Sequence, residues 1–575
     1  MLRRIFSYMK EYKKYAWLAL ICIGVEVVLE IMVPKLMADL IDIGVTNSDV
    51  PYIINKGIQM AVCAVAALIL GVGSARFSAL AGQGLGANIR KAEYEKLQSY
   101  SFSNIDHFSV SSLVTRLTSD VTNIQNAVST GMRPFGRSPV MLIFATTLAF
   151  RINSTLALVF LVALPILAVL LIIIIINVGP RYGRMQGAVD LVNRCIEENL
   201  TAVRVVKSYV RGDYEIEKFR NVNDNLKNES EKAFGIAVLN MPAMQFVMYS
   251  TILGILLIGG RLINSGQMMI GQLTSFLSYV LLILNSLMMM SNVFLLMTRS
   301  LASAERIMKI IDEPIDITDE NAKDIEVKKG EIEFNHVWFK YKDTAKEYVL
   351  SDVSFHINAG QTVGIIGQTG SSKTTLIQLI PRLYDASKGE IKIDGISIKE
   401  YPVRHLRDAI SVVLQKNTLF SGSLIDNLRW GDENATLDEI KEACSIACVD
   451  EFIDRLPRGL DAEMGQEGVN VSGGQKQRIC IARAILKKPK VLILDDSTSA
   501  VDTATEGKIR NALAKKLPDM TKIIIAQRIS SVCHADQIII MDGGRVDAIG
   551  THESLLKTNK IYQEIYESQK EGADL

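Results

Sequence analysis

The chain lacks an excess of charge of either sign, and it has few cysteines. Its 575 residues include 63 basic and 62 acidic side chains, so the overall balance does not favour binding to nucleic acid. Seven cysteines show no spacing typical of a metal site. Cys444 and Cys448 lie one helical turn apart, but no histidine or further cysteine accompanies them. We therefore expect reduced thiols and no nucleic-acid partner.

A cleavage site for a secretory signal is also missing. The N-terminus has basic residues followed by an apolar run, as a signal peptide has, but no small-residue cleavage motif follows. Glu26 and Glu30 interrupt the run. The segment is therefore predicted to remain as a first membrane span.

Apolar residues are concentrated in the first 300 positions, and 575 residues are too many for one core. Six stretches approach the length that a helix needs to cross a membrane. We predict a multidomain membrane protein, with an all-α six-helix transmembrane domain over residues 1–315 and a soluble α/β domain over 328–575. The stretches are Ala16–Met32, Ile58–Leu80, Ser138–Phe150, Leu156–Val178, Pro242–Gly260 and Leu273–Met297. The third is short, and the polar turn Arg151–Ser154 makes it a hairpin with the fourth.

Basic residues gather on one side of the predicted spans. The segments after the second and fourth spans carry many, and the opposite loops carry few, so the basic side is expected in the cytoplasm. We expect a multi-pass protein of the cell membrane, in contact with lipid, with both termini and the soluble domain in the cytoplasm. The basic side has Arg90, Lys91, Lys96, Arg116, Arg181, Arg184, Arg204, Lys207 and Arg211, and the opposite side has Lys56, Arg151 and Arg261.

The two basic segments are long, polar and helical in pattern. Asn104–Phe108 and Gly212-Asp213 are short breaks between helical runs. Helices that extend beyond the bilayer and turn there would present compact contacts to a cytoplasmic domain. Ordinary solvent-facing helices explain the pattern equally well, and both interpretations stay open.

Glu26 and Glu30 share one face of the first span. Carboxylates inside a membrane usually face a cavity or a partner, and Glu26 is the better candidate for a substrate-cavity acid. A packed, hydrogen-bonded glutamate is the alternative. Several methionines, among them Met244 and Met288–Met290, could form an adaptable cavity wall, although plain packing also accounts for them.

A glycine-rich loop follows a strand-like run in the second half. Gly364–Thr375 precedes a helical pattern, the setting in which backbone N–H groups and a helix N-terminus bind phosphates. Lys373 would pair with outer phosphate oxygens and Thr374 would bind Mg²⁺. Ser372 stands where the pattern requires glycine, and its Cβ crowds the approach to phosphate. The loop residues expected to bind nucleotide are Gly367, Gln368, Thr369, Gly370, Ser371, Ser372, Lys373, Thr374 and Thr375.

Two further motifs support a nucleotide site. Leu492–Asp495 reads as a buried strand ending in a metal-supporting acid, and Asp496 follows it. Asn470–Arg478 is a glycine-rich turn that opens a helix. Its N–H groups and Ser472 could hold a γ-phosphate. Because the chain already has one phosphate loop, the second cradle would serve ATP on a different subunit.

In this order the motifs resemble an ATP-binding-cassette (ABC) exporter half-transporter, over essentially the whole chain. The resemblance implies an α/β P-loop nucleotide-binding domain that uses ATP and Mg²⁺ as part of a dimeric transport ATPase, or translocase. Thr374, Gln415 and Asp495 would support Mg²⁺, and Tyr341 would stack on adenine. The corresponding motifs are Walker A at Gly367–Thr374, Walker B at Leu492–Asp495, the signature at Val471–Gln475 (Ser472, Gly473, Gly474, Gln475), the D-loop at Ser499–Asp502, the switch at Ile523–Ser530, and coupling helices at Asn104–Phe108 and Arg211–Tyr214.

The chain departs from that family at its catalytic positions. Asp496 replaces the usual Glu, Gln527 replaces the switch His, and Gln466 replaces a Glu before the signature. The shorter Asp withdraws its carboxylate by roughly 1 Å, which can cost on the order of 100-fold in rate. Glutamine cannot relay a proton as histidine does. We expect this site to bind ATP and hydrolyse it slowly.

The intact signature would then complete a competent site whose Glu and His come from a partner half-transporter. The hypothesis is a heterodimeric multidrug-type exporter that works by alternating access. A homodimer with two slow sites and an ATP-gated channel or regulatory subunit remain alternatives. The sequence does not define the transported small molecule: lipophilic cations, lipids and peptides all fit. The absence of a protease-like extension argues against peptide processing.

Overall fold

The computed structural model describes residues 2–320, 322–342, 344–496 and 500–571. They form two compact units, one of residues 1–98 and 110–312 and the other of residues 99–109 and 313–575. The first unit is entirely helical. Its elements are α1 (Leu2–Ser7), η1 (Lys10–Tyr12), α2 (Lys13–Asp39), η2 (Leu40–Val45), α3 (Val50–Gln98), α5 (Val110–Thr115), η3 (Arg116–Asp120), α6 (Val121–Ser129), α7 (Met132–Ile152), α8 (Ser154–Thr201), α9 (Val203–Ser208), α10 (Gly212–Ala237), α11 (Asn240–Asn264) and α12 (Ile270–Asp312).

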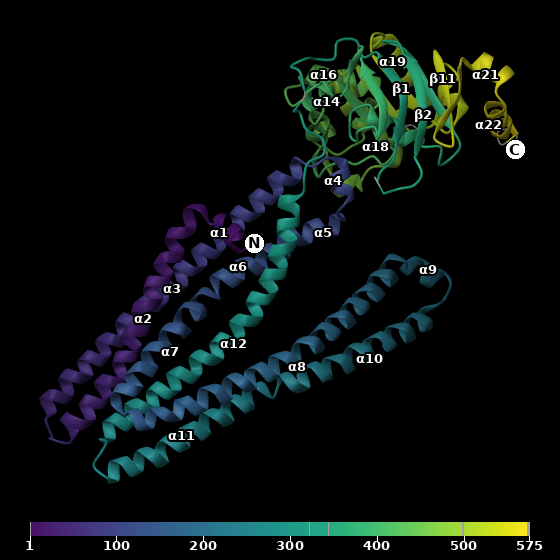
Figure 1. Ribbon diagram of the computed structural model, residues 1–575. Coiled ribbons are helices and arrows are strands. Elements are labelled where there is room, and N and C mark those ends of the chain that lie inside the picture. The colour runs from purple at the N-terminus through teal and green to yellow at the C-terminus, as the bar shows by residue number, and fades with distance from the viewer. Residues whose placement is uncertain (1, 321, 343, 497–499, 572–575) are drawn as a thin grey trace. The chain divides into compact units, whose positions relative to one another are not determined.

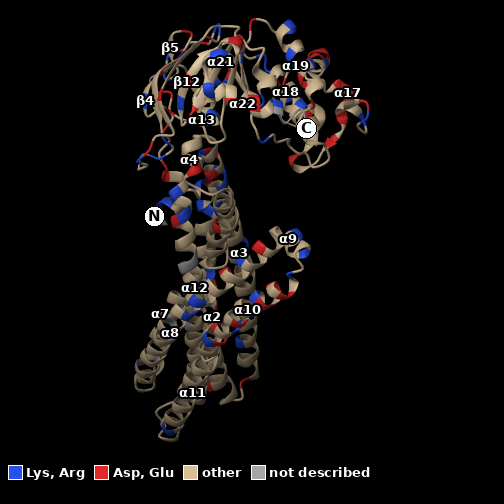
Figure 2. Ribbon diagram, turned by 90° about the vertical axis from the view of Figure 1, so that its right-hand side faces the viewer, with Lys and Arg blue, Asp and Glu red and all other residues tan. Residues whose placement is uncertain are grey.

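Helices form at all six predicted places. Among the described residues, four stretches are long and apolar enough to cross a membrane: Lys10–Val45, Val50–Gln98, Gly212–Asn264 and Ile270–Met290. Long parts of the helices in this unit are tan in Figure 2, because they contain no Lys, Arg, Asp or Glu. α2 packs along α3 and α7, and α8 packs along α10 and α11 (Figure 1). The expected hairpin is present: α7 ends at Ile152, α8 begins at Ser154, and the two helices contact each other. Asn153, between them, caps α8 by accepting a hydrogen bond from Leu156 N at 3.0 Å.

Two helix boundaries differ from the sequence prediction. α7 begins at Met132 rather than near Ser138, so Arg133 and Arg137 also lie inside the helix. The short helix between α8 and α10 is Val203–Ser208, not Arg211–Tyr214. Val210, with φ of 54°, turns the chain before α10 begins at Gly212.

The second unit contains two main sheets, a short antiparallel pair formed by β7 and β8, and the helices that cover them. The larger sheet has the order β12-β11-β3-β10-β9-β6, parallel except for β12; the smaller has the antiparallel order β2-β1-β4-β5. The strands are β1 (Ile332–Phe339), β2 (Leu350–Ile357), β3 (Thr362–Gly367), β4 (Lys388–Ile393), β5 (Ile396–Ser397), β6 (Ile410–Val413), β7 (Gly422–Ser423), β8 (Glu463–Met464), β9 (Val491–Asp495), β10 (Thr521–Ile525), β11 (Gln537–Asp542) and β12 (Arg545–Gly550). The helices are α4 (Phe102–Asp106), α13 (Lys373–Leu379), α14 (Val403–Asp408), α15 (Leu424–Arg429), α16 (Leu437–Ile446), α17 (Asp450–Ile453), η4 (Gly459–Asp461), η5 (Gln466–Gly468), α18 (Gly473–Leu486), α19 (Thr503–Lys516), α20 (Ile529–Val532), α21 (His552–Thr558) and α22 (Lys560–Glu571).

Helix α4 belongs to this second unit, although it lies between α3 and α5 in sequence. Asp106 Oδ2 accepts a hydrogen bond from Tyr384 Oη at 2.7 Å, and the rings of Phe102 and Tyr384 are 6.1 Å apart. Asn104 donates to Pro314 O at 2.8 Å. The predicted break at Asn104–Phe108 is therefore a short helix with cassette contacts.

Glycine in the membrane unit allows close helix packing at specific points. A Cβ on Gly82 of α3 would lie 2.8 Å from Gln125 O and 2.9 Å from Ser129 N of α6, whereas a Cβ on Gly57 meets nothing within 4 Å. Both positions are helical, so alanine gains about 1 kcal/mol of helix propensity at each. Overpacking at Gly82 costs about 1–3 kcal/mol. Gly82→Ala is expected to lower the thermal midpoint of the purified protein, and Gly57→Ala to leave it equal or higher. Equal midpoints for the two variants would contradict this packing.

Candidate functional site

The parallel sheet brings the separate motifs to one edge. Ile525 of β10 pairs with Ile365 of β3 and with Asp495 of β9, and Val413 of β6 pairs with Leu494. The residues that follow these strand ends therefore lie together, as expected for parallel strands. They are the Walker A loop after β3, Gln415 after β6, Asp495 and Asp496 at the end of β9, and Gln527 after β10.

The Walker A loop has the backbone of a phosphate site. A Cβ on Gly367 would lie 2.1 Å from Met541 O, so only glycine fits where the loop begins. Lys373, the first residue of α13, donates to Gly367 O at 2.9 Å, Gln368 O at 2.8 Å and Ser371 Oγ at 3.1 Å. Burial lowers the pKa of Lys373, which its attraction to Asp495 and Asp496 partly offsets. The ammonium thus points into its own loop.

Ser372 adopts a conformation that glycine would adopt at no steric cost. Its φ is 67° and its ψ is 24°, the left-handed region, immediately before α13. A residue with a Cβ is strained there by roughly 1–2 kcal/mol. Serine at this position therefore costs conformational free energy that glycine would not cost. This cost is separate from any crowding of phosphate by the Ser372 Cβ.

Three side chains fit a magnesium ion. Asp495 is 2% exposed, and its Oδ2 has no hydrogen-bond partner. Its Oδ1 accepts from Thr374 Oγ1 at 3.3 Å. Burial raises the pKa of Asp495, as does the charge of Asp496, while Thr374 and Lys373 lower it. A buried carboxylate oxygen without a donor, beside a hydroxyl, is an oxygen environment that Mg²⁺ takes. The third side chain, Gln415, bonds to the adjacent Asp496.

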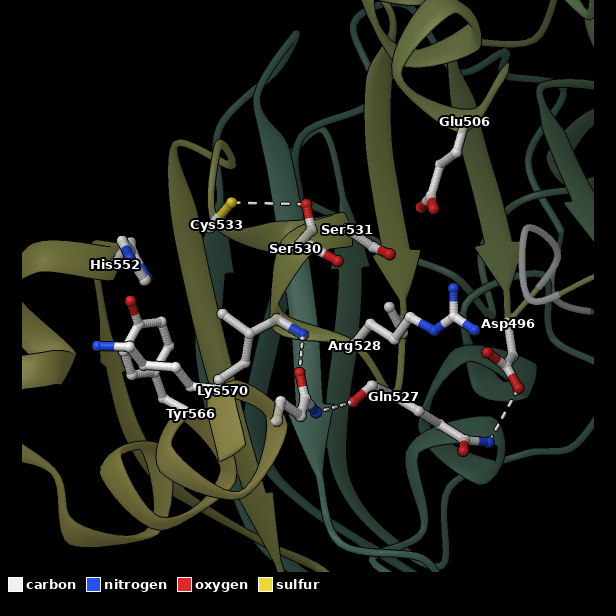
Figure 3. Close-up of a pocket in the computed structure, with 13 residues that line it drawn as sticks. Asp496, Glu506, Gln527, Arg528, Ser530, Ser531, Cys533, His552, Tyr566 and Lys570 are labelled. Carbon is white, nitrogen blue, oxygen red and sulfur yellow. Dashed lines mark hydrogen bonds between the residues drawn. The ribbon is translucent and has the colours of Figure 1, made fainter. Parts of the chain in front are cut away.

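Asp496 is held by two amides. Gln527 Nε2 donates to Asp496 Oδ2 at 2.9 Å (Figure 3). Gln415 Nε2 donates to the same oxygen at 3.4 Å. The φ of Asp496 is 48°. Burial raises its pKa, and the bonds from the two glutamines lower it. Sequence reasoning identified all three residues but not this direct contact between the two replaced catalytic positions.

Gln569, on the last helix α22, is a site residue that the sequence did not reveal. Its side-chain amide donates to Gln527 O at 2.7 Å and accepts from Ile529 N at 2.9 Å. Gln569 therefore holds the switch segment at both ends of Arg528. These residues, with His552, line a cavity of about 880 Å³ that reaches Asp496 (Figure 3). Nothing in the local sequence links Gln569 to a motif about forty residues earlier.

Tyr341 lies beside the start of α13. Its hydroxyl is 2.9 Å from Thr375 Oγ1 and donates to Gln378 Oε1 at 3.3 Å. Its ring packs edge-on against Phe339 and Tyr384 and is 43% exposed. An exposed aromatic ring next to the phosphate loop is positioned to receive a base.

The signature turn caps its own helix. Ser472 N donates to Gln475 Oε1 at 2.9 Å, and Gln475 N donates to Ser472 Oγ at 3.3 Å, a capping box at the start of α18. A Cβ on Gly474 would lie 2.7 Å from Ala500 O. Asp502 caps α19 by accepting from Thr505 N at 3.0 Å. Ser499 of the predicted D-loop lies outside the described residues.

Comparisons with known proteins define the family. Residues 16–287 match the model of the ABC transporter transmembrane region, and residues 350–499 match the ABC transporter model. A Bacillus subtilis ABC transporter ATP-binding protein, YfiB, is 37% identical over 575 residues, all of both chains. The chain belongs to the ABC transporter family.

Two further relatives describe its place in that family. An ATP-dependent lipid A-core flippase of Pseudomonas putida is 32% identical over 98% of this chain and 95% of the relative. A bacterial Atm1-family ABC exporter, solved with ATP bound, superposes with a TM-score of 0.84 at 22% identity, over 97% of this chain and 99% of the other. This ABC transporter is therefore a half-transporter by arrangement, with a helical membrane region followed by one cytoplasmic cassette.

Glu26 of this ABC transporter is buried in ion pairs. It is 4% exposed and lies 2.6 Å from Arg133 Nη2 and 3.4 Å from Arg137 Nη1. Arg137 also pairs with Glu30 at 2.6 Å. Glu26 and Glu30 both line a cavity of about 750 Å³. The sequence identified Glu26 as a cavity residue but missed both arginines, because the third span was predicted to begin after them.

The strain at Ser372 gives a stability prediction. Ser372→Gly is expected to stabilise the nucleotide-free cassette by about 1 kcal/mol, because glycine adopts positive φ without a Cβ penalty. Thr369→Gly, in the same loop but without positive φ, is the matched control and should be neutral or destabilising. Thermal unfolding of the full chain without nucleotide measures both. A downward shift for Ser372→Gly would contradict the strain.

The pKa values of two aspartates predict opposite effects of charge removal. Asp495 has a raised pKa, so its charge destabilises the fold above that pKa and has no effect below the ordinary value of about 4. Asp495→Asn should raise the thermal midpoint at pH 7.5, with the gain vanishing near pH 4, and should abolish Mg²⁺-dependent stabilisation by ATP.

Asp502 is the control for this prediction. Its pKa is lowered, chiefly by the backbone bond from Thr505, so its charge stabilises the fold above the ordinary pKa and this is lost in acid. Asparagine also caps helices well, so Asp502→Asn should lower the midpoint slightly at pH 7.5. Shifts of the same sign for both variants would refute the assignment.

Proposed function

We propose that this chain is one half of a heterodimeric ABC exporter for lipophilic small molecules in the cell membrane. Its own Walker site binds Mg²⁺-ATP and hydrolyses it slowly. The observation that carries the proposal is the 2.9 Å bond from Gln527 to Asp496. The switch position thus offers this carboxylate an amide, which cannot exchange a proton as an imidazole does, and the Asp496 side chain is one carbon shorter than that of glutamate.

The groups that bind nucleotide support retention of ATP. Lys373 and the loop backbone would hold phosphates, Tyr341 would contact the base, and Thr374 and Asp495 would hold Mg²⁺. Bound Mg²⁺ would neutralise phosphate charge. Gln415 and Gln527, both on Asp496, would change partners when a γ-phosphate arrives. The chain thus keeps the groups for binding nucleotide and departs from the family at the two catalytic positions. This selective change is better explained by a specialised function than by general loss of function.

The signature supports a second, competent site on the partner. ABC exporters work as dimers, and the capping box at Ser472 aligns the N-terminus of α18, a 14-residue helix, for an anion. In this proposal the partner provides the catalytic Glu and switch His, and Ser472–Gln475 completes that site. ATP held at the slow site favours association of the two cassettes, a population shift through differential binding.

Alternating access would then move the substrate. Closure of the cassettes on ATP would be transmitted through α4, whose Asp106 already contacts Tyr384 of the cassette fold. The membrane helices would open outward and release the molecule.

The test isolates each site in the tagged chain purified from the membranes of its own host, so that a partner remains bound. Ser472→Arg should stop hydrolysis at the partner's site and leave only the slow one. Adding Asp496→Glu and Gln527→His to Ser472→Arg should raise steady-state ATP hydrolysis on the order of 10–100-fold, since both catalytic groups return.

Lys373→Ala in the triple variant is the control and should abolish the gained activity. Two results would overturn the proposal: brisk hydrolysis by the chain purified without any partner, or full activity of the Ser472→Arg single variant in the assembled complex.

A further inference from the structure

A balanced set of four charges lies inside the membrane unit. Glu26 and Glu30 are one turn apart on α2, and Arg133 and Arg137 are one turn apart on α7. Arg133 pairs with Glu26, and Arg137 pairs with both glutamates, at 2.6–3.4 Å. The set carries two negative and two positive charges. It therefore adds no net charge to a low-dielectric region.

The four side chains differ in how far they are buried. The inner two are well covered, with side-chain exposures of 5% for Glu26 and 17% for Arg137. The outer two are more accessible, at 41% for Arg133 and 31% for Glu30. The accessible pair thus consists of one cation and one anion, and each is already bonded to an inner residue of opposite charge.

These accessible groups line a largely apolar cavity of about 750 Å³. Its walls come from α2, α3, α7 and α12 and include Pro34, Leu68, Val72 and Leu281. Gly71 of α3 allows the close approach, since a Cβ there would lie 3.2 Å from both Arg133 Nη2 and Glu26 Oε1. The volume is in the range of sites for drug-sized molecules.

We propose that this cavity binds a zwitterionic amphiphile, a molecule with one cationic group, one anionic group and an apolar body. This inference rests on the proposed export function and names the class of its substrate. The anionic group takes remaining donors of the Arg133 guanidinium, which has five N–H donors in total. The cationic group takes the exposed side of the Glu30 carboxylate, and the apolar body contacts the aliphatic walls.

Charge balance disfavours lipophilic ligands that carry charge of only one sign. A lipophilic cation would add one net positive charge to a neutral cluster, or would displace an arginine from Glu26 and leave it unpaired. A lipophilic anion would add net negative charge, or would displace a glutamate from its arginine and leave that glutamate unpaired. Both outcomes leave a charge without a counter-charge among the apolar walls of the cavity, which is unfavourable. A zwitterion satisfies both accessible groups and keeps the site neutral.

The first test needs no variant. The full chain in maltoside micelles is titrated with three probes that share a twelve-carbon chain: lauroyl lysophosphatidylethanolamine, lauroyl lysophosphatidic acid and dodecylammonium. Direct binding is measured by native mass spectrometry. The zwitterion should bind at least about ten-fold more tightly than either the anionic or the cationic probe. Equal or tighter binding of dodecylammonium or of the lysophosphatidic acid would overturn the proposal.

Variants then locate the site. Arg133→Gln and Glu30→Gln should each remove the ten-fold preference for the zwitterion, whereas Arg133→Lys should keep most of it. Arg151→Gln, near the other end of α7 and exposed, is the matched control and should bind all three probes as the unaltered chain does. Unchanged preference in both Arg133→Gln and Glu30→Gln would refute the assignment.

ATP binding measured on the same preparations separates this inference from the proposed function. If the Arg133→Gln and Glu30→Gln variants lose the preference for the zwitterion but bind Mg²⁺-ATP normally, the effect lies in the cavity and not in the nucleotide site. Failure of the nucleotide proposal would appear in the hydrolysis assays and would leave the probe ranking unaffected.

Discussion

The register of β10 against β9 and β3 fixes the position of each nucleotide-binding group. Asp495 and Ile365 both lie opposite Ile525, so the acid proposed to bind Mg²⁺ and the Walker A loop are placed at one sheet edge. Side chains alternate along a strand, and a shift of one residue would send Asp495 to the opposite face. All five residues of β9 are buried, and this apolar burial on both faces secures the register. The chemistry of the site thus depends on packing that has no chemical role itself.

Two of the buried carboxylates, Asp495 and Glu26, differ in how their charge is compensated. Asp495 keeps an oxygen without a hydrogen-bond partner, which suits the proposed binding of Mg²⁺ together with a nucleotide. Glu26 also has an oxygen without a hydrogen-bond partner, Oε2, but arginines from a neighbouring helix pair with its Oε1. In the first case the buried charge leaves room for a ligand charge. In the second the charge is already balanced, and this makes the cavity selective for ligands that are neutral overall.

Local motifs and apolar length were sufficient to predict much of this architecture from sequence. The glycine-rich loop, the acid after β9, the signature and the positions of the long helices are all encoded within short windows. Contacts between distant segments were not predictable in this way. The arginines of α7 and the amide of Gln569 have partners roughly 110 and 40 residues away, and no periodicity connects them. The backbone angle at Ser372 was also outside sequence reasoning, which identified only the unusual residue type.

Helix α22 contributes to the candidate nucleotide site, although it is the last helix of the chain. Through one glutamine it fixes both the carbonyl of Gln527 and the N–H of Ile529. A recombinant cassette whose boundary falls before position 569 would keep every recognised motif and still lose this support. Domain limits for expression, and fusions at the C-terminal end, therefore bear directly on how the switch segment is oriented.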